Sequence, residues 1–392
     1  MKLNRRDFLF TSAPAAATGL GLLQTSTLLA QAQPQIPSAP AHPAPPITDR
    51  TVALMGDAIP ITPQGRIQQL AHLLDLKPQA NDVYLKAGAV QELEGAIAAM
   101  LGKDDAAFLP TGTLANNLAI RLLCGDKRHA LVQHESHLYL DEGDSAQVLS
   151  GINLVPLSPG KAAPNYEELA AAIDSAEHGQ YPIQVGAISI ESPVRRQNGA
   201  SVPFAELERI HTLARQHGIG MHWDGARSLL LTGTPGFDLR RTSALFDTVY
   251  VSLYKYLGAP YGAVLAGDKE LIAKAREMRH IYGGLIYQGW QAALPALDAL
   301  PGFPSRFLQA RAHSEQLLAG LQTAGGFTVI HVENGSNIHR LQVSPERLQG
   351  LQARLDAADI RARIPADGMM SLSVNESILR RSPEELVKAF TG

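Results

Sequence analysis

The sequence has very little cysteine and no strong excess of either charge. Cys124 is the single cysteine among 392 residues, so no disulfide can form within the chain. The 34 basic and 37 acidic residues leave a net charge of −3, which gives no electrostatic footprint for a nucleic-acid partner. No run of about 18 apolar residues follows Ala32, so no membrane span is predicted there. With 45% hydrophobic and 18% charged residues, the composition is that of a globular protein.

Three common signatures of enzymes are also missing. No serine stands in the Gly-x-Ser-x-Gly pattern of a nucleophile elbow. Gly19 and Gly21 lie in an N-terminal apolar run and form no dinucleotide fingerprint. His134 and His137 are three residues apart, but they follow a strand pattern and not a helical one, so no metal site is predicted. The chemistry must therefore come from other residues.

The N-terminus resembles an export signal. Arg5 and Arg6 precede a modest apolar run over residues 13–29, and Ala30-Gln31-Ala32 has the small-x-small form of a cleavage site. The paired arginines predict the twin-arginine route, with an ordinary secretory signal as the alternative. Residues 1–32 are therefore predicted to be a twin-arginine signal peptide, with the twin-arginine export machinery as a partner and the periplasm as the destination.

Hydrophobic periodicity predicts an α/β fold for residues 49–300. Short apolar runs, such as 130–132 and 185–190, alternate with helical patterns such as 202–217. This alternation predicts a large domain with a mostly parallel sheet covered by helices, in which ligands gather at the carboxyl ends of the strands.

Proline and glycine mark the limits of this predicted domain. Residues 33–48 are rich in proline and alanine and are expected to form an extended linker. Pro301-Gly302-Phe303-Pro304 predicts a boundary, after which residues 301–392 are expected to form a small C-terminal α/β domain.

Two buried strand patterns each end in one charged residue. Residues 219–223 lead to Asp224, and residues 246–253 lead to Lys255. Pyridoxal phosphate requires a lysine for its Schiff base and a carboxylate that keeps the pyridine nitrogen protonated. Each residue alone also has a simpler interpretation, a helix N-cap for Asp224 and a strand-end lysine for Lys255. Together they predict a pyridoxal phosphate site.

A turn that suits a phosphate group stands upstream of these strands. Thr111, Gly112 and Thr113 follow a short apolar run and open the helical pattern of residues 114–123. The free N–H groups and positive dipole at such a helix start, with two hydroxyls, favour a phosphate monoester. An ordinary helix cap is the alternative.

These pieces, in this order, resemble the threonine aldolase and β-eliminating lyase family of fold-type-I pyridoxal phosphate enzymes. The resemblance extends from about Ile47 to the C-terminus. It rests on these segments of the chain: Asp82-Val83-Tyr84, Gln91-Glu92-Leu93-Glu94, Pro110-Thr111-Gly112-Thr113, Ser136-His137 with Glu142, Glu191-Ser192-Pro193-Val194-Arg195-Arg196, His222-Trp223-Asp224-Gly225-Ala226-Arg227 and Ser252-Leu253-Tyr254-Lys255-Tyr256-Leu257-Gly258.

The resemblance implies roles for the cofactor-binding residues. Lys255 would carry the cofactor and Asp224 would pair with its pyridine nitrogen. Thr111, Gly112 and Thr113 would hold its phosphate. His137 would stack on the pyridine face and is the candidate base.

The resemblance also implies contacts for the substrate. Arg227 would contact either the cofactor's phenolic oxygen or the substrate carboxylate, and Tyr84 would form a wall of the pocket. Familiar threonine aldolases have a second histidine that approaches the substrate hydroxyl, where this chain has Val194. They also usually have an arginine near the C-terminus that binds the substrate carboxylate, but residues 369–373 of this chain contain none. We therefore expect Arg195, or its neighbour Arg196, to bind the substrate carboxylate, since planar guanidinium groups suit bidentate contacts.

The activity implied by the resemblance is that of a threonine aldolase. Such an enzyme would cleave a β-hydroxy-α-amino acid into glycine and an aldehyde. Substitution of the second histidine by Val194 also leaves β-elimination and racemisation open. A third alternative is an exported relative that binds an amino acid without turnover. The resemblance further implies a homodimer or homotetramer.

Overall fold

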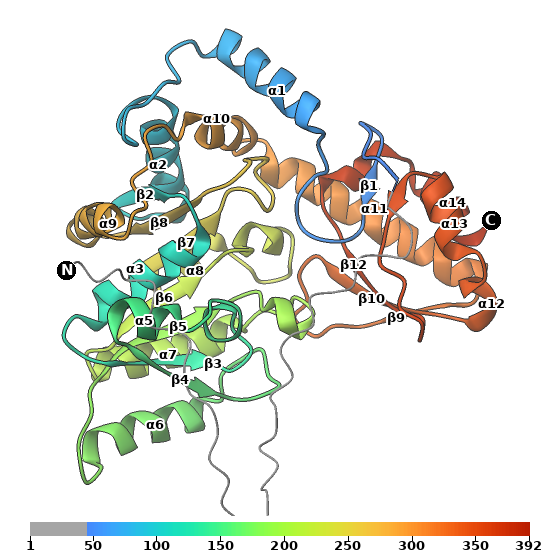
Figure 1. The fold of residues 1–392 in the computed structure, drawn as a ribbon. Coiled ribbons are helices and arrows are strands. Elements are labelled where there is room, and N and C mark those ends of the chain that lie inside the picture. Colours follow the sequence, from blue (N-terminus) through green and yellow to red (C-terminus); the bar gives the residue numbers. More distant parts are fainter. Residues whose placement is uncertain (1–44) are drawn as a thin grey trace, which may run out of the picture. The chain divides into compact units, whose positions relative to one another are not determined.

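The computed structural model describes residues 45–392 (Figure 1). The predicted signal peptide, residues 1–32, lies outside the described residues, as does most of the predicted linker. Within residues 45–392, no helix is long and apolar enough to cross a membrane.

The centre of the fold is a seven-stranded sheet with the order β2-β8-β7-β6-β5-β3-β4. Strands β3 to β7 are mutually parallel, and β8 alone runs in the opposite direction. The predicted mostly parallel sheet is therefore confirmed. The strands are β2 (Asp105–Leu109), β3 (His129–Gln133), β4 (Asn153–Leu157), β5 (Val185–Glu191), β6 (Gly220–Asp224), β7 (Thr248–Ser252) and β8 (Ala263–Gly267).

Helices cover both faces of this sheet, because alternate residues of each strand point to opposite sides. On one face, Tyr250 and Leu265 pack with side chains of α3 and α9. On the other face, Val249 and Val264 belong to the core that includes α2 and α7. The helices of this region are α1 (Pro63–Leu76), α2 (Gly88–Leu101), α3 (Gly112–Cys124), α4 (His137–Leu140), α5 (Ser145–Ser150), α6 (Tyr166–His178), α7 (Phe204–Gln216), α8 (Leu239–Ser243), α9 (Lys269–Ile281) and α10 (Trp290–Ala299), with short 3-10 helices at Arg195–Gln197 and Ser228–Leu231.

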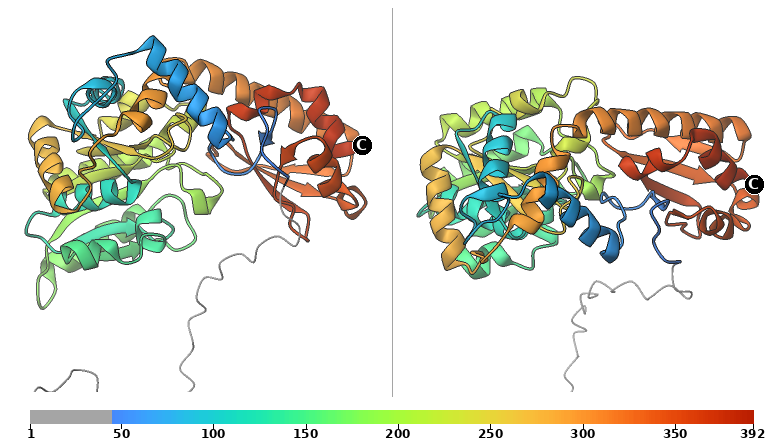
Figure 2. Two further views of the ribbon diagram at one scale, coloured as in Figure 1. Left: turned by 45° about the horizontal axis from the view of Figure 1, so that its top comes forward. Right: turned by 90° about the horizontal axis from the view of Figure 1, so that it is seen from above.

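The C-terminal part has its own three-stranded antiparallel sheet, with the order β12-β10-β9. Figure 2 shows the long helix α11 alongside it. The elements are α11 (Phe303–Ala324), β9 (Phe327–Ile330), β10 (Ile338–Val343), α12 (Pro345–Leu348), α13 (Leu351–Ala357), β11 (Ile360–Arg361), β12 (Met369–Ser373), a 3-10 helix at Glu376–Arg380 and α14 (Pro383–Thr391). The domain boundary after residue 300 stays a prediction.

The first described residues return to this C-terminal part. Strand β1 (Val52–Ala53) pairs in parallel with β11. Asn375 Nδ2 donates a hydrogen bond of 2.9 Å to the carbonyl oxygen of Ala53. Residues 52–53 are thus fixed against the other end of the chain, and the segment that follows them can deliver Asp57 to the interior.

The strand register sets the position of the functional side chains. Glu191 of β5 lies beside Asp224 of β6, which in turn lies beside Tyr250 of β7. Side chains at paired positions of neighbouring strands project to the same face. The carboxyl ends of three parallel strands therefore bring two carboxylates and one phenol together.

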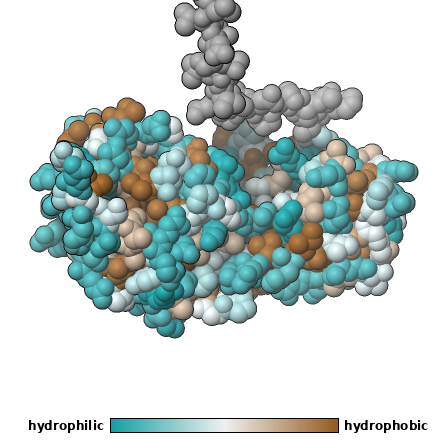
Figure 3. All heavy atoms as spheres, turned by 90° about the horizontal axis from the view of Figure 1, so that it is seen from below, coloured by the Kyte–Doolittle hydropathy of each residue, from teal (hydrophilic) through white to brown (hydrophobic). Residues whose placement is uncertain are grey.

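Hydrophobic side chains also reach the surface. The face in Figure 3 carries several brown patches over the left-hand part, which holds the seven-stranded sheet. Val148 and Ile281 are each 75% exposed and Leu149 is 53% exposed. Leu149 and Ile281 line an open hollow next to Thr111 and Thr113.

Candidate active site

A cavity of about 390 Å³ opens at the carboxyl ends of β5, β6 and β7. Parallel α/β sheets bind their ligands at this edge. Seven of the nine predicted site residues line it: Thr111, Gly112, Thr113, His137, Asp224, Arg227 and Lys255. Tyr84 and Arg195 are not among its lining residues.

The start of α3 forms one end of the cavity. The Thr111 side chain caps the helix, accepting a hydrogen bond of 3.1 Å from the N–H of Leu114. The first N–H groups of a helix have no partner within it, so those of Gly112 and Thr113 remain available to an anion. A Cβ at Gly112 would lie only 2.1 Å from the Tyr250 hydroxyl. Glycine is therefore required here, because the tyrosine occupies the space of a side chain.

Asp224 lies at the floor of the cavity and is 2% exposed. Its Oδ2 accepts a hydrogen bond of 2.9 Å from Asn116 Nδ2, and its Oδ1 accepts one of 3.1 Å from the N–H of Ala226. The second contact is a local turn, as an Asp at the end of a strand often forms. The carboxylate is thus held in one orientation from two sides.

Lys255 lies in the connection between β7 and β8. Burial, with the charge of Arg227 as the second cause, lowers the pKa of its amine to about 8. The Nζ atom lies 5.8 Å from the ring centre of Tyr250 and 5.2 Å from that of Tyr254. A larger share of this amine is uncharged near neutral pH than of an exposed lysine, which suits it to attack a carbonyl carbon.

Arg227 is held by a buried ion pair. Its Nε donates to Oδ2 of Asp57 over 2.8 Å, and both side chains are less than 10% exposed. Asp57 comes from the segment that follows β1, so this contact joins the first described residues to the cavity. Arg227 also lines the cavity. Its two other guanidinium nitrogens, Nη1 and Nη2, can therefore bind an oxygen of a cofactor or substrate.

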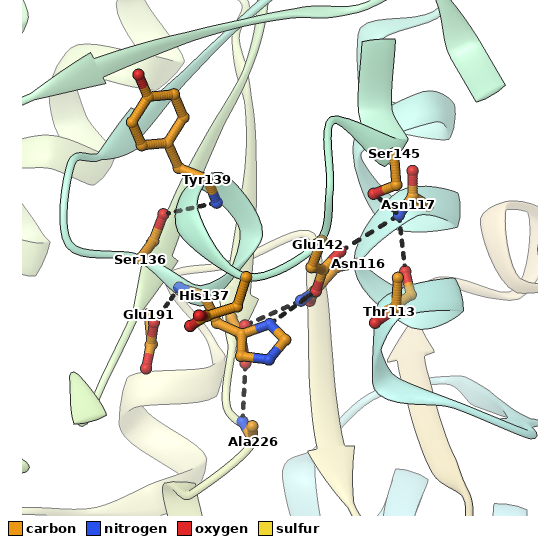
Figure 4. Close-up of polar contacts among 12 residues, drawn as sticks. Thr113, Asn116, Asn117, Ser136, His137, Tyr139, Glu142, Ser145, Glu191 and Ala226 are labelled. Carbon is orange, nitrogen blue, oxygen red and sulfur yellow. Dashed lines mark hydrogen bonds and ion pairs between the residues drawn. The ribbon is translucent and has the colours of Figure 1, made fainter. Parts of the chain in front are cut away.

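His137 begins the short helix α4 at the rim of the cavity (Figure 4). Its N–H donates to Glu191 Oε2 over 2.6 Å, and its Nδ1 lies 3.0 Å from Glu142 Oε1. The hydrogen bond with Glu142 is the main reason that the pKa of the imidazole is raised above its usual 6.5. Both carboxylates therefore fix this histidine, one through its backbone and one through its ring.

Glu191 is a buried acid that the sequence did not single out as a site residue. It is 3% exposed and lines the cavity. Burial and the neighbouring charge of Asp224 raise its pKa to about 7. The protonated form of Glu191 is therefore favoured more than that of an exposed glutamate.

Tyr84 and Arg195 lie outside this cavity. The Tyr84 ring is in edge contact with Tyr287, with 5.3 Å between ring centres, and the residue is 50% exposed. Arg195 and Arg196 both form exposed ion pairs with Asp141. The substrate-binding roles expected for Tyr84 and Arg195 stay predictions.

Other lining or supporting residues were missed from the sequence. Glu142 and Glu191 stand inside the segments that carry the resemblance, so their position was a usable signal. Tyr250 could be inferred from the strand register, because it lies beside Asp224. Asn116 gives no signal, since nothing distinguishes a polar residue that faces a buried carboxylate from one that faces solvent.

The donor set of this cavity fits pyridoxal phosphate. An amine, a fixed carboxylate and a helix N-terminus lie around one space, and Gly112 leaves no side chain between the helix start and Tyr250. These are the groups that a pyridine aldehyde with a phosphate arm requires.

Comparisons with known proteins agree with this geometry. Residues 77–366 match the family described as "Beta-eliminating lyase". The chain belongs to this family. The predicted family and its fold-type-I class are thus confirmed, and together with the cavity they indicate a pyridoxal phosphate lyase.

Individual relatives cover part of the chain. The alanine racemase TOXG of Cochliobolus carbonum is 32% identical over 243 residues, which are 61% of this chain and 60% of that protein. The low specificity L-threonine aldolase of Escherichia coli K12 is 28% identical over 260 residues, 63% of this chain and 73% of that protein. Similarity to the first relative thus spans less than two thirds of its length.

Solved structures share the fold. A threonine aldolase of Leishmania major has 18% identity and a TM-score of 0.69, covering 86% of this chain and 97% of that chain. A serine palmitoyltransferase of S. paucimobilis has 16% identity and a TM-score of 0.62, covering 87% and 86%. At these identities the likeness supports the fold alone.

Proposed function

We propose that this protein cleaves a β-hydroxy-α-amino acid into glycine and an aldehyde, with pyridoxal phosphate as its cofactor. The observation that carries the proposal is the single cavity onto which Lys255, Asp224 and His137 converge. Membership of the beta-eliminating lyase family and the aldolase relatives support it. When bound, the cofactor supplies an electron sink for the bond that breaks at the substrate's Cα.

The lining residues divide the work of holding this cofactor. Lys255 would hold it covalently through an amine whose pKa of about 8 leaves an uncharged fraction near neutral pH. Asp224 would keep a proton on the pyridine nitrogen. The N–H groups of Gly112 and Thr113 would bind the phosphate at the start of α3.

His137 is proposed to take the proton of the substrate's β-hydroxyl group. Among residues 45–392, it is the one imidazole that lines the cavity. Val194, which replaces the second histidine of familiar aldolases, is fully buried and has no group that could accept a proton. A positioned imidazole near its pKa is an effective base at neutral pH.

An absorbance titration tests the cofactor and the reaction together. The purified protein and its Lys255→Ala variant would be titrated with L-threonine, L-allo-threonine and phenylserine while aldehyde is assayed. A band near ~420 nm that requires Lys255, with release of aldehyde, would support the proposal. A band that shifts without aldehyde would reject aldol cleavage and leave elimination, racemisation or binding without turnover. No band after reconstitution would reject the cofactor.

Racemisation is the second candidate, and one comparison favours it. The relative with 32% identity is an alanine racemase. Inversion at Cα requires proton transfer at that carbon and no base for a β-hydroxyl group, so it does not need the histidine that Val194 replaces. Incubation with L-alanine in deuterium oxide would distinguish the two: solvent deuterium at Cα with inversion supports the racemase, and an unchanged substrate rejects it.

The substrate carboxylate is proposed to bind Arg227, or Arg195 with Arg196 as its alternative, or Arg227 together with one of these two. Arg227 lines the cavity already, whereas Arg195 would have to leave its exposed ion pair with Asp141. Exposed pairs contribute about 0–1 kcal/mol, so this exchange is inexpensive. Replacing Arg195 with alanine should raise KM with little change in kcat, and Arg209→Ala, another exposed ion-paired arginine, is the control. An unchanged KM would exclude Arg195 and leave Arg227 and Arg196 as candidates.

Export through the twin-arginine route is also proposed, on the sequence of residues 1–32 alone. Arg5 and Arg6 before an apolar run support it. Residues 1–48 would be fused to a folded reporter, with Arg5 and Arg6 changed to lysine in the control. Periplasmic signal that survives the double change would refute the twin-arginine route.

The protein is further proposed to act as a homodimer or homotetramer. The hollow beside Thr111 and Thr113 is lined by Leu149 and Ile281, whose exposed apolar surface a second copy could cover. Light scattering gives the test. A monomer at micromolar concentration would refute the proposal, and Ile281→Asp should dissociate the assembly if this surface forms the interface.

A further inference from the structure

Glu142 lines the cavity but has no role in the proposed function. Its side chain has no solvent exposure. Three groups surround its carboxylate: Asn116 Nδ2 at 2.8 Å and His137 Nδ1 at 3.0 Å from Oε1, and Asn117 Nδ2 at 3.3 Å from Oε2 (Figure 4). Two successive residues of α3 thus hold one carboxylate against the histidine.

The position of Glu142 fixes the proton on the imidazole. Burial raises the pKa of Glu142, whereas the hydrogen bonds from His137 and Asn116 lower it and favour the carboxylate. As a carboxylate Glu142 can only accept, so the Nδ1 of His137 carries the hydrogen and donates it. The Nε2 of His137 makes no hydrogen bond with any residue of the described chain, and it is therefore the nitrogen left for a ligand. The carboxylate that accepts from one ring nitrogen determines which nitrogen acts as the base.

Asn116 joins this pair to the floor of the cavity. The same Nδ2 that donates to Glu142 also donates to Asp224 Oδ2 over 2.9 Å. Its Oδ1 accepts from His222 Nε2 over 3.0 Å, and His222 Nδ1 accepts from Thr248 Oγ1 over 2.9 Å. Burial lowers the pKa of His222 to about 4, so this imidazole is neutral and donates only through Nε2.

The order of donors leaves one orientation for the Asn116 amide. A flipped amide would turn its oxygen toward two carboxylates and its nitrogen toward the N–H of His222, which loses every bond in the chain. All donors from Thr248 onward therefore point toward Glu142 and Asp224. The amide groups of Asn116 are both used, since its Nδ2 donates to Glu142 and Asp224 and its Oδ1 accepts from His222.

We propose that Glu142 is the positioning residue of His137, and that Asn116 links its carboxylate to that of Asp224. The inference rests on the proposed function for its role in turnover, but not for its effect on the imidazole. The charged groups that act on the ring are Glu142, Asp224 and Glu191, and all three favour its protonated form. Of these, Glu142 is the one that contacts the ring itself.

The test follows His137 directly in the full-length protein, before and after saturation with pyridoxal phosphate. Histidine labelled with ¹³C at Cε1 would be titrated by NMR, with His137→Asn used to assign the signal. Glu142→Gln keeps the size of the side chain but removes its charge, so the pKa of His137 should fall. Glu142→Asp restores the charge and should bring the pKa back toward that of the wild type.

A second variant, Asn116→Ser, should shift the pKa of His137 in the opposite direction. It removes one of the two donors to Glu142 Oε1, so the hydrogen bond from His137 Nδ1 to this oxygen becomes stronger and the pKa of His137 should rise. Glu135→Gln is the matched control, because His134 Nδ1 and Glu135 Oε1 form a similar pair at 2.9 Å near the surface. This control should leave the His137 signal unchanged.

Turnover gives an independent readout. In Glu142→Gln, kcat should fall about 10-fold to 100-fold, because a misplaced base loses part of the 10²–10⁴-fold effect typical of general base catalysis. The acid limb of its pH profile should move to lower pH, and the Kd for the cofactor should stay within about threefold. A merely structural role would move neither the limb nor the NMR titration.

Two results would overturn the inference: a pKa of His137 that does not move in Glu142→Gln, or one that falls in Asn116→Ser. A wild-type protein without aldehyde release or inversion would instead refute the proposed function. The NMR comparison would still decide the role of Glu142 in that case, so the two failures are distinguishable.

Discussion

Replacing Lys255 with methionine should make the cofactor-free protein more stable at neutral pH. Burial lowers the pKa of this amine from 10.5 to about 8. Each pKa unit corresponds to about 1.4 kcal/mol, so the folded protein carries a penalty of about 3 kcal/mol for the charged form. Methionine has a similar length and no charge, and therefore removes the penalty.

The pH dependence of this stabilisation follows from the protonation of Lys255 in the folded and in the unfolded chain. Below pH 8 the amine is charged in both the folded and the unfolded chain, and the penalty is complete. It disappears as the pH rises from about 8 to 10.5, because the folded protein releases its proton first. The advantage of Lys255→Met should therefore be about 3 kcal/mol at pH 7 and close to zero at pH 10.5.

Urea unfolding of the cofactor-free proteins, followed by tryptophan fluorescence between pH 7 and pH 10, measures this difference. Lys274→Met, at an exposed position of α9, is the control and should change the free energy of unfolding by less than about 0.5 kcal/mol. A Lys255→Met variant that is no more stable than the wild type at pH 7, or an advantage that is independent of pH, would refute the reasoning. The buried amine of Lys255 would then not lower the free energy of unfolding.

Four further outcomes follow from the cavity. Uptake of pyridoxal phosphate by the cofactor-free protein should accelerate as the pH rises toward 8, since the uncharged amine of Lys255 attacks; a flat profile in stopped-flow absorbance would contradict this. The Tyr250 hydroxyl lies beside Gly112 at the start of α3, where the phosphate is proposed to bind, so it can donate to that phosphate. Tyr250→Phe should therefore raise the Kd for the cofactor about tenfold or more in fluorescence titrations, because a hydrogen bond to a charged group contributes about 1.5–3 kcal/mol; an equal Kd would contradict this role of the hydroxyl. Gly112→Ala should also weaken cofactor binding, because its Cβ would lie 2.1 Å from the Tyr250 hydroxyl, whereas Gly95→Ala, with open space around it, should not. Asp57→Asn should lower the free energy of unfolding by about 3 kcal/mol, because it leaves the Arg227 guanidinium buried without its counter-charge; a loss below about 0.5 kcal/mol in urea would contradict this.

The parts of the site that depend on strand ends could be predicted from the sequence. Asp224 ends β6, and Lys255 follows the fully buried β7 by three residues. Their convergence follows from the rule that parallel strands present their carboxyl ends together. Thr111 to Thr113 were placed by the same logic, because a helix start follows β2. Local pattern and sheet geometry agree at these positions.

The contacts between distant segments could not be predicted in this way. Asp57 pairs with Arg227 across 170 residues, and β1 and β11 are strands of two residues with no periodicity to detect. The sequence also could not show that Arg195 pairs with Asp141 at the surface, because the direction of a long side chain depends on its neighbours. Such features come from tertiary packing, which a single sequence does not reveal.

The direction of β8 has a consequence for the reactive lysine. Since β7 and β8 are antiparallel neighbours, the connection that carries Lys255 is closed at its base like a hairpin, and the N–H of Leu253 donates to the carbonyl oxygen of Gly262 over 3.1 Å. The two ends of the segment that carries Lys255 are therefore held by the middle of the main sheet, whose opening is as rare as global unfolding. With these ends fixed, rotations within the four-carbon side chain provide the travel of the amine between its bound and released positions. The reach of that side chain then sets the limit on where a reacting carbonyl carbon can lie.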